Sequence, residues 1–192
     1  YIDIFPLLSI GDYYYTDTHW RQDCIVDVAK HLADAMGTDI DTVYTTQELD
    51  NPFYGVYYGQ LGLPVDADRI TYLTNDTLAN CIVYDHQNDR EMSVYDMDKA
   101  ADRDPYEMFL GGSLAVITID NPNANTDKEL VIFRDSFGSS IAPLLVEGYA
   151  KITLLDARYL HQNMIGNFVT FDNQDVLFLH STSVLNNEIA FK

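Results

Sequence analysis

The chain has 192 residues, enough for one domain with a sizeable core or for one domain with an added lobe. Its 30 acidic residues outnumber 11 Lys and Arg, and the formal net charge of −19 opposes non-specific binding to nucleic acid or to an anionic membrane. The sequence contains no apolar run of 18 residues that would predict a transmembrane helix, and no Cys and His cluster at metal-ligand spacing.

The chain opens abruptly, as if already inside a strand. Tyr1 to Phe5 has neither the basic start nor the apolar core of a signal peptide, so we expect that an upstream segment is missing. Cys24 and Cys81 are too few for a disulfide framework. We favour two free buried thiols, with a single Cys24–Cys81 bridge as the alternative.

A helix is predicted from Arg21 to Met36, because apolar residues recur there at steps of three and four. Gly37 follows as a stop signal. Residues 39–90 instead alternate aromatic and β-branched residues with polar ones, and the stretches 53–58, 69–73 and 81–84 are strand-like. This region predicts a small β-rich insertion or lid.

Many of the chain's 14 tyrosines fall in this region. They could form a platform for sugar rings. The alternative, which we favour at this point, is that they pack on sheet edges with their hydroxyls in water.

From Gly112 onward, apolar strands alternate with helical or loop segments. The strands are expected at 114–119, 130–133, 151–156 and 175–179. Continuous apolar strands of this kind are typical of a parallel α/β sheet buried on both faces. We therefore predict one α/β domain over residues 1–192 with a mainly parallel sheet.

A polar turn carrying Asp135 and Ser136 follows the strand at 130–133. We expect Ser139 or Ser140 to cap a helix over residues 141–146. A serine between a buried strand and a helix is well placed to be a nucleophile, because free backbone N–H groups beside it can hold an oxyanion. The alternative is that these serines only cap the helix.

Among the five histidines, His19 differs because Asp17 stands two residues before it. Residues i and i+2 face the same side of an extended backbone. The carboxylate could then orient the imidazole, and the imidazole could take the proton of Ser136. The alternative is that Asp17 and His19 cap the helix that begins near Arg21.

Three blocks of the sequence resemble one family. The stretch ending in Thr16-Asp17-Thr18-His19-Trp20 resembles the Tyr-Tyr-x-Thr-Asp-x-His-Trp signature of the DHHW family, shared with related SGNH-like proteins of alginate and cell-wall polysaccharide acetylation. Residues 130–156 resemble the family's nucleophile block with the following strand, and Phe109-Leu110-Gly111-Gly112-Ser113 resembles its Phe-Leu-Gly-Gly-Asn block.

The resemblance implies a flavodoxin-like, three-layer α/β/α SGNH-like fold with residues 39–90 as an insertion. It also implies a catalytic triad of Ser136, His19 and Asp17. In this group the Asp-x-His pair precedes the serine, whereas ordinary SGNH hydrolases place the serine block first. No metal or organic cofactor is expected.

Two positions depart from the family pattern. Ser113 stands where the family usually has Asn, so we expect an oxyanion hole made by the N–H groups of Gly112 and Ser136, with Ser113 assisting. Arg134 replaces the small residue of the usual Gly-Asp-Ser turn and could pair with an acid or contact substrate. The candidate substrate contacts are Arg134, Tyr15 and Trp20.

The function implied is that of a serine esterase or O-acetyltransferase acting on acetyl esters of carbohydrate at a bacterial cell surface. The partners expected are a carbohydrate or acyl-ester substrate, and neither nucleic acid nor a membrane span. The competing hypothesis is a non-catalytic carbohydrate-binding or surface-scaffold protein with a degenerate site. The sequence does not separate esterase from transferase, nor does it identify the glycan, the acyl donor or the oligomeric state.

Overall fold

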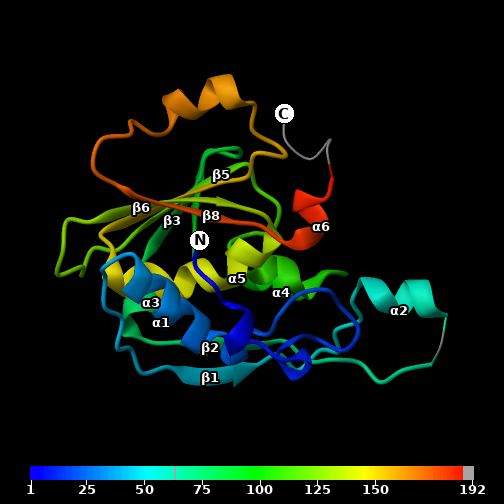
Figure 1. Cartoon of the computed structure of the whole chain (residues 1–192). Helices are drawn as coiled ribbons and strands as arrows, with labels where there is room; N and C mark the ends of the chain where they lie inside the picture. The colour runs from blue at the N-terminus through cyan, green and yellow to red at the C-terminus, as the bar shows by residue number, and fades with distance from the viewer. Residues whose placement is uncertain (63, 188–192) are drawn as a thin grey trace.

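A six-stranded mixed sheet forms the centre of the computed structural model, which describes residues 1–62 and 64–187 (Figure 1). In spatial order its strands are β4 (Arg90–Met92), β3 (Ile82–Asp85), β5 (Val116–Asp120), β7 (Lys151–Leu155), β6 (Glu129–Arg134) and β8 (Asp175–Leu179). Neighbours from β4 to β7 are antiparallel, whereas β6 is parallel to both β7 and β8. A separate antiparallel pair joins β1 (Thr45–Glu48) to β2 (Thr71–Thr74).

The prediction of a mainly parallel, flavodoxin-like three-layer sheet is wrong. The apolar run of β5 was interpreted as parallel, but β5 pairs antiparallel with both β3 and β7. Four of its five residues are buried because the strand lies in the middle of the sheet. A continuous apolar run reports burial on both faces, and a central antiparallel strand shows the same pattern.

The α-helices are short, and one face of the sheet carries the longer ones. They are α1 (Val26–Ala35), α2 (Val56–Leu61), α3 (Asp76–Asn80), α4 (Met97–Ala100), α5 (Ser136–Leu145) and α6 (Thr182–Leu185). The 3-10 helices are Phe5–Leu7, Ile10–Asp12, Gln22–Cys24, Pro105–Met108, Val146–Gly148 and Gln162–Asn167. Both α1 and α5 lie on the lower face of the sheet in Figure 1, and the segment 156–174 passes over the upper face.

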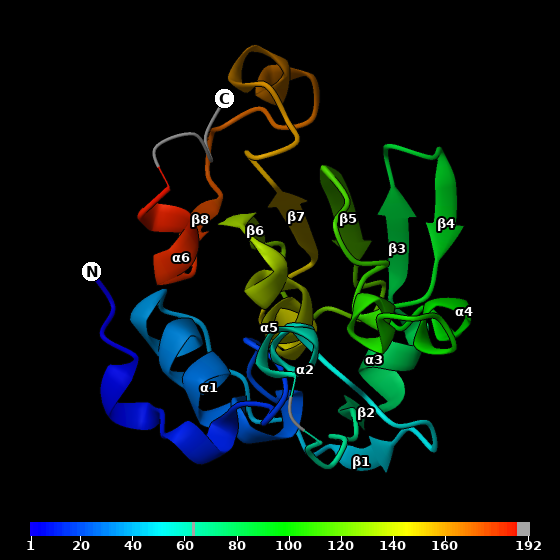
Figure 2. The same ribbon diagram turned by 90° about the vertical axis from the view of Figure 1, so that its right-hand side faces the viewer.

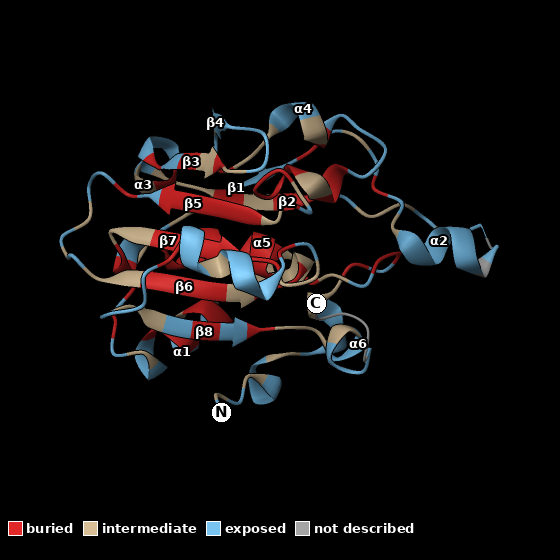
Figure 3. Cartoon of the chain, turned by 90° about the horizontal axis from the view of Figure 1, so that it is seen from above, coloured by how far each residue is buried: buried red, intermediate tan, exposed pale blue. Residues whose placement is uncertain are grey.

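The core follows the alternation of side chains along β6. Leu130 and Ile132 belong to the large apolar cluster that includes residues of α1 and α5. Val131, between them, belongs to a smaller cluster on the other face with Leu155 and Leu160. The period of two in a strand produces this division, and Figure 3 shows the burial of β5, β6 and β7.

Residues 39–90 contribute to both sheets, because β1 and β2 form the small sheet while β3 joins the large one. The stretch 53–58 is not a strand as predicted, since α2 begins at Val56. The helix predicted after Arg21 is confirmed as α1, with Gly37 in the left-handed region at φ 67°. The helix α5 starts at Ser136 rather than at residue 141, and Asp135, not Ser139 or Ser140, caps it.

Cys24 and Cys81 are both free, and Cys81 is buried while Cys24 is half-buried. Burial raises the pKa of Cys81 to about 11 and also raises that of Cys24, so both thiols stay protonated near neutral pH. Among the described residues, no helix has the length and apolar character needed to cross a membrane.

Candidate active site

The segment that carries Asp17 and His19 is a tight loop closed at its base. Tyr13 and Trp20 form an antiparallel bridge, and the N–H of Tyr14 donates to the carbonyl of His19 at 3.0 Å. The carboxylate of Asp68 accepts the N–H groups of Tyr15 and Thr16 and the hydroxyl of Thr16, at 2.6 to 2.9 Å. These bonds fix the loop backbone that presents the Asp-x-His pair.

Asp17, His19 and Ser136 form one continuous chain of hydrogen bonds. Asp17 Oδ1 lies 2.5 Å from His19 Nδ1, and His19 Nε2 lies 2.7 Å from Ser136 Oγ. With the carboxylate on Nδ1, the arrangement assigns the imidazole proton to Nδ1, so Nε2 accepts the hydroxyl of Ser136. The structure therefore brings together the three residues that the sequence singled out, in the geometry of a nucleophile and its base.

Ser136 owes its position to the junction between β6 and α5. Asp135 caps α5, since its Oδ1 accepts the N–H of Phe137 at 3.0 Å. Its Oδ2 accepts the N–H of Ser181 at 2.7 Å, and this second bond holds the Asp135 carboxylate in place. Ser136 is the first residue of α5, and the first N–H groups of a helix have no intrahelical acceptor. The hydroxyl and the N–H of Ser136 thus sit together at the positive end of a helix dipole.

Asp17 is kept ionised although it is only 5% exposed. Burial would raise its pKa, but the hydrogen bond and charge of His19, with the N–H groups of Val56 and His19, outweigh burial and lower the pKa of Asp17. The Val56 N–H reaches Asp17 Oδ2 at 2.9 Å. Gly55 allows this approach, because a Cβ there would lie 2.2 Å from the Cβ of Asp17.

The face of the His19 ring is covered by Tyr106. The two rings stack with centroids 3.9 Å apart and planes 15° apart. The hydroxyl of Tyr106 lies 2.8 Å from Ser140 Oγ, and this hydrogen bond holds Tyr106 in place. Ser140 Oγ also accepts the indole N–H of Trp20 at 2.9 Å. Asp17 holds the imidazole at its edge, and Tyr106 restrains it across its face.

The segment predicted to form the oxyanion hole is a turn of left-handed residues. Leu110, Gly111 and Gly112 have φ of 53°, 69° and 81°. The Gly112 N–H already donates to the carbonyl of Phe109 at 3.2 Å, so it would have to leave this turn to bind an oxyanion. Ser113 is exposed. Of the expected donors, the Ser136 N–H is the one that this arrangement leaves at the nucleophile.

The three predicted substrate contacts lie in different environments. Arg134 is fully buried, and its guanidinium donates to the carbonyl of Leu114 and to Ser139 Oγ, both at 3.1 Å. Trp20 is 3% exposed and packs in the core. Burial thus makes both residues structural in this arrangement, whereas Tyr15 is 76% exposed and can meet a ligand.

Sequence reasoning missed Tyr106, Gly55 and Asp68, which position His19, Asp17 and the loop that carries both. Each lies far along the chain from Asp17 and His19 and has no spacing relation to them. Two signals were available: an aromatic residue just before the Phe-Leu-Gly-Gly block, and a glycine within a tyrosine-rich stretch.

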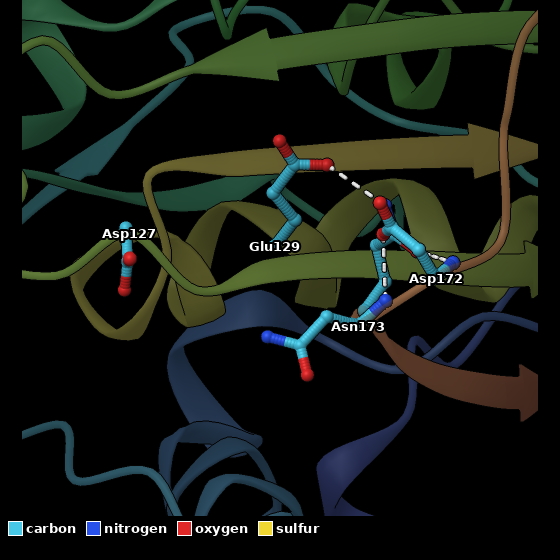
Figure 4. A pocket seen from close by; sticks show the side chains of 5 residues that line it. Asp127, Glu129, Asp172 and Asn173 are labelled. Atoms are coloured by element: carbon cyan, nitrogen blue, oxygen red, sulfur yellow. Dashed lines mark hydrogen bonds between the residues drawn. The ribbon is translucent and has the colours of Figure 1, made fainter.

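Two cavities of the structure lie away from this site. One cavity of about 150 Å³ is lined by Asp127, Glu129, Asp172, Asn173 and Gln174, near the amino end of β6 (Figure 4). Ser136 follows the opposite end of that strand. Within residues 1–62 and 64–187, no group of three or more His, Cys, Asp or Glu is arranged to hold a metal ion.

Comparison with known proteins identifies the family. The family model described as DHHW protein matches residues 10–155. The chain belongs to the DHHW family. The matched range includes Asp17, His19 and Ser136, and so contains the whole hydrogen-bonded chain described above.

Solved structures share the fold. A DHHW family protein from Eubacterium siraeum has 23% identity and a TM-score of 0.68, covering 93% of this chain and 62% of its own. Bacillus cereus PatB1 has 24% identity and a TM-score of 0.68, and the match covers 94% of this chain and 66% of PatB1. The structure of PatB1 with a sulfonyl adduct has 23% identity and a TM-score of 0.68, and this match covers 94% of this chain and 64% of that one. This DHHW chain therefore spans less than two thirds of the length of these structures. A search of curated proteins finds no match.

Proposed function

We propose that this DHHW chain is a serine acyl-transfer enzyme, an esterase or an O-acetyltransferase, that acts on acetyl esters of carbohydrate. The observation that carries the proposal is the chain of hydrogen bonds from Asp17 through His19 to Ser136. An imidazole within 2.7 Å of a serine hydroxyl and oriented by a carboxylate is the arrangement that activates serine as a nucleophile.

In the first half of the reaction, Ser136 Oγ attacks the ester carbonyl while its proton passes to His19 Nε2. The imidazolium then lies between Asp17 and Ser136 Oγ, and the ionised carboxylate stabilises its positive charge. Collapse of the tetrahedral intermediate breaks the bond to the alcohol oxygen, which takes the proton from Nε2. The acyl group remains on Ser136.

In the second half, water or a sugar hydroxyl attacks the acyl-enzyme and gives its proton to His19 Nε2. That proton returns to Ser136 Oγ as the acyl group leaves, so the enzyme is restored. Water yields a free acid, and a sugar hydroxyl yields a new ester. The Ser136 N–H, at the start of the ten-residue helix α5, is the donor we assign to the oxyanion in both halves.

The carbohydrate substrate and a bacterial cell-surface location rest on resemblance to proteins of polysaccharide acetylation. The charge adds a constraint, because a formal net charge of −19 repels polyanions such as nucleic acids. Membership of the DHHW family and the fold shared with PatB1 support this proposal.

The proposal is tested by covalent labelling with a fluorophosphonate, with a sulfonyl fluoride as a second probe. We expect the wild type to label and Ser136→Ala and His19→Ala not to label, while all three keep the same circular dichroism spectrum. The same two variants should hydrolyse 4-nitrophenyl acetate about 10³-fold more slowly than the wild type, or slower still. A folded wild type that neither labels nor hydrolyses the ester would favour the non-catalytic carbohydrate-binding alternative.

A further inference from the structure

We propose that four exposed tyrosines beside the site, Tyr15, Tyr54, Tyr57 and Tyr58, form the subsite that binds the sugar chain, and that this subsite selects uncharged sugars. We call these residues the tyrosine surface. The inference rests on the proposed function and deepens it, since it assigns a place and a charge preference to the carbohydrate.

The tyrosine surface is attached directly to the segment that carries Asp17. The N–H of Tyr57 donates to the carbonyl of Thr16 at 2.9 Å, and the N–H of Gly55 donates to Thr16 Oγ1 at 3.0 Å. Tyr15 precedes Thr16, and Tyr54 precedes Gly55, which touches Asp17. Each of the four tyrosines therefore either contacts the segment that carries Asp17 or is the next residue in the chain to one that does. Neighbouring Cα atoms are about 3.8 Å apart, so all four tyrosines lie close to this segment.

The surface also lies on the side of the molecule where Ser136 is found. Figures 1 and 3 show α2 projecting from the body of the molecule at the side where β6 ends, and in Figure 2 it lies nearer the viewer than α5. Ser136 begins α5, and the hydrogen bonds from Val56 to Asp17 and from His19 to Ser136 connect the two helices through the site. A sugar chain lying on the first turn of α2, where Val56 bonds to Asp17, would thus pass close to the nucleophile.

The exposed area suits a sugar better than a protein partner. Tyr15 is 76% exposed and Tyr54, Tyr57 and Tyr58 are 47%, 40% and 39% exposed. Tyrosines bury 150–250 Å² each when covered, so the surface offers roughly 300–500 Å², about half of what one partner contributes to a stable protein interface.

The chemistry of tyrosine matches that of a sugar ring. The rings of Tyr54 and Tyr58 lie 4.5 Å apart at 50° and so present adjacent aromatic faces. An aromatic face packs against the C–H groups of a pyranose, and a hydroxyl at the ring edge bonds to sugar hydroxyls.

The charge around the surface decides between sugars. Residues 53–60 contain no charged side chain. Two carboxylates are bonded to this surface: that of Asp17, which is ionised and accepts the N–H of Val56, and that of Asp68, which accepts the N–H groups of Tyr15 and Thr16. Arg69, which follows Asp68, donates to the carbonyls of Leu49 and Asp50 and pairs with Glu48, so its charge is already engaged. A uronate or phosphate group on the surface would therefore meet repulsion from the two carboxylates.

Binding is measured in the Ser136→Ala background, so that turnover does not interfere. The probes are the neutral tetrasaccharides chitotetraose, cellotetraose and mannotetraose and the anionic tetragalacturonate, titrated by calorimetry. We expect at least one neutral probe to bind about tenfold or more tightly than tetragalacturonate. Adding Tyr54→Ala and Tyr58→Ala should weaken that binding about tenfold, and Tyr54→Phe with Tyr58→Phe should retain most of it.

Tyr1→Ala is the matched control, because Tyr1 is exposed but lies outside the surface. The inference is overturned if the double alanine variant binds as tightly as its parent, if tetragalacturonate binds as well as every neutral probe, or if no neutral probe binds. Labelling of Ser136 with no glycan binding would overturn only this inference. Binding without labelling would overturn only the enzymatic proposal.

Discussion

At the scale of single residues, each member of the hydrogen-bonded chain is held by a group from another part of the sequence. Val56 donates to Asp17, Tyr106 covers His19, and Asp135 caps the helix that starts at Ser136. Orientation of this kind matters because a displacement of about 1 Å at a reacting group can cost 10²-fold in rate. The supporting residues are therefore as open to test as the three themselves.

Tyr106 is expected to act as a positioning residue for His19. Tyr106→Leu removes the stacked ring, and we expect kcat for 4-nitrophenyl acetate to fall about tenfold with little change in KM, since such a stack is worth about 0.5–1.5 kcal/mol. Tyr106→Phe keeps the ring and loses only the bond to Ser140, so its loss should be smaller. Steady-state kinetics measure both.

Phe109→Leu is the control for Tyr106. Phe109 is fully buried and contacts Tyr106 at 5.0 Å between ring centroids, so its loss disturbs the same cluster. We expect this variant to lose stability and to retain kcat. An equal fall of kcat in Phe109→Leu and Tyr106→Leu would mean that Tyr106 contributes only packing.

The lowered pKa of Asp17 predicts a pH-dependent contribution to stability. The pKa of Asp17 in the folded state lies below the ordinary value of 3.8. Such a carboxyl stabilises the fold fully at pH values above its ordinary pKa. This contribution is lost as pH falls through the folded pKa. The unfolding free energy of Asp17→Asn should therefore lie further below that of the wild type at pH 7 than at pH 3.

Urea unfolding at the two pH values measures this difference. Asp66→Asn serves as the control, because Asp66 is exposed and lies outside the hydrogen-bonded chain of the site, so it shows the effect of removing one surface carboxylate. A gap for Asp17→Asn that is unchanged at pH 3 would contradict the role of His19 and Val56 in stabilising the carboxylate. The same variant should lose about 10³- to 10⁴-fold in kcat, since the tautomer of His19 is then no longer fixed.

At the scale of elements, the sequence pattern located most strands and α1 but misjudged the ends that build the site. The strand predicted at 175–179 is β8 residue for residue, since it was placed on a continuous apolar run. The start of α5 was placed too late because Ser139 and Ser140 resemble caps. Asp135 takes that role instead, and this earlier start is what puts Ser136 on the first turn.

The contact of α2 with Asp17 gives a prediction at this scale. Gly55→Ala would place a Cβ 2.2 Å from the Cβ of Asp17, so the start of α2 or the carboxylate must move. We expect kcat/KM to fall about 10²-fold through displacement of the triad, and the unfolding free energy to fall by about 1–3 kcal/mol through overpacking. Ester hydrolysis and urea unfolding report the two effects.

Gly59→Ala tests whether the effect is specific to that contact. Gly59 lies inside α2, and a Cβ there would meet nothing within 4 Å. Alanine in a helix interior is favoured over glycine by about 0.5–1 kcal/mol, so this variant should keep its activity and gain slightly in stability. If Gly55→Ala behaved like Gly59→Ala, the approach of α2 to Asp17 would not control the site.

At the scale of the whole molecule, the sequence indicated which segments are buried but not the direction in which they run. Burial sets the apolar pattern of β5, while its direction depends on which strands it joins. The large sheet recruits β3 and β4 from residues assigned to or next to the insertion, and these extend it with antiparallel neighbours. By contrast, the Asp-x-His and serine blocks could be paired in advance through the resemblance to the DHHW family, since the residues alone left open that they only cap helices.

The acidic surface is the other property of the whole molecule with a measurable consequence. With 30 acidic residues against 11 Lys and Arg, self-repulsion opposes the compact state near neutral pH. Exposed ion pairs such as Arg69 with Glu48 contribute little in return. Salt shortens the range of this repulsion, since the Debye length falls from about 30 Å at 0.01 M to about 10 Å at 0.1 M.

We therefore expect the melting temperature at pH 7 to rise when sodium chloride is increased from about 10 mM to about 200 mM. Relief of about 1 kcal/mol corresponds to about 2–4 °C for a chain of this size. The same titration near pH 4.2, the isoelectric point calculated from the sequence, is the control, because little net repulsion remains to be screened there. A melting temperature that falls with salt at pH 7 would mean that attractive pairs outweigh the excess of carboxylates.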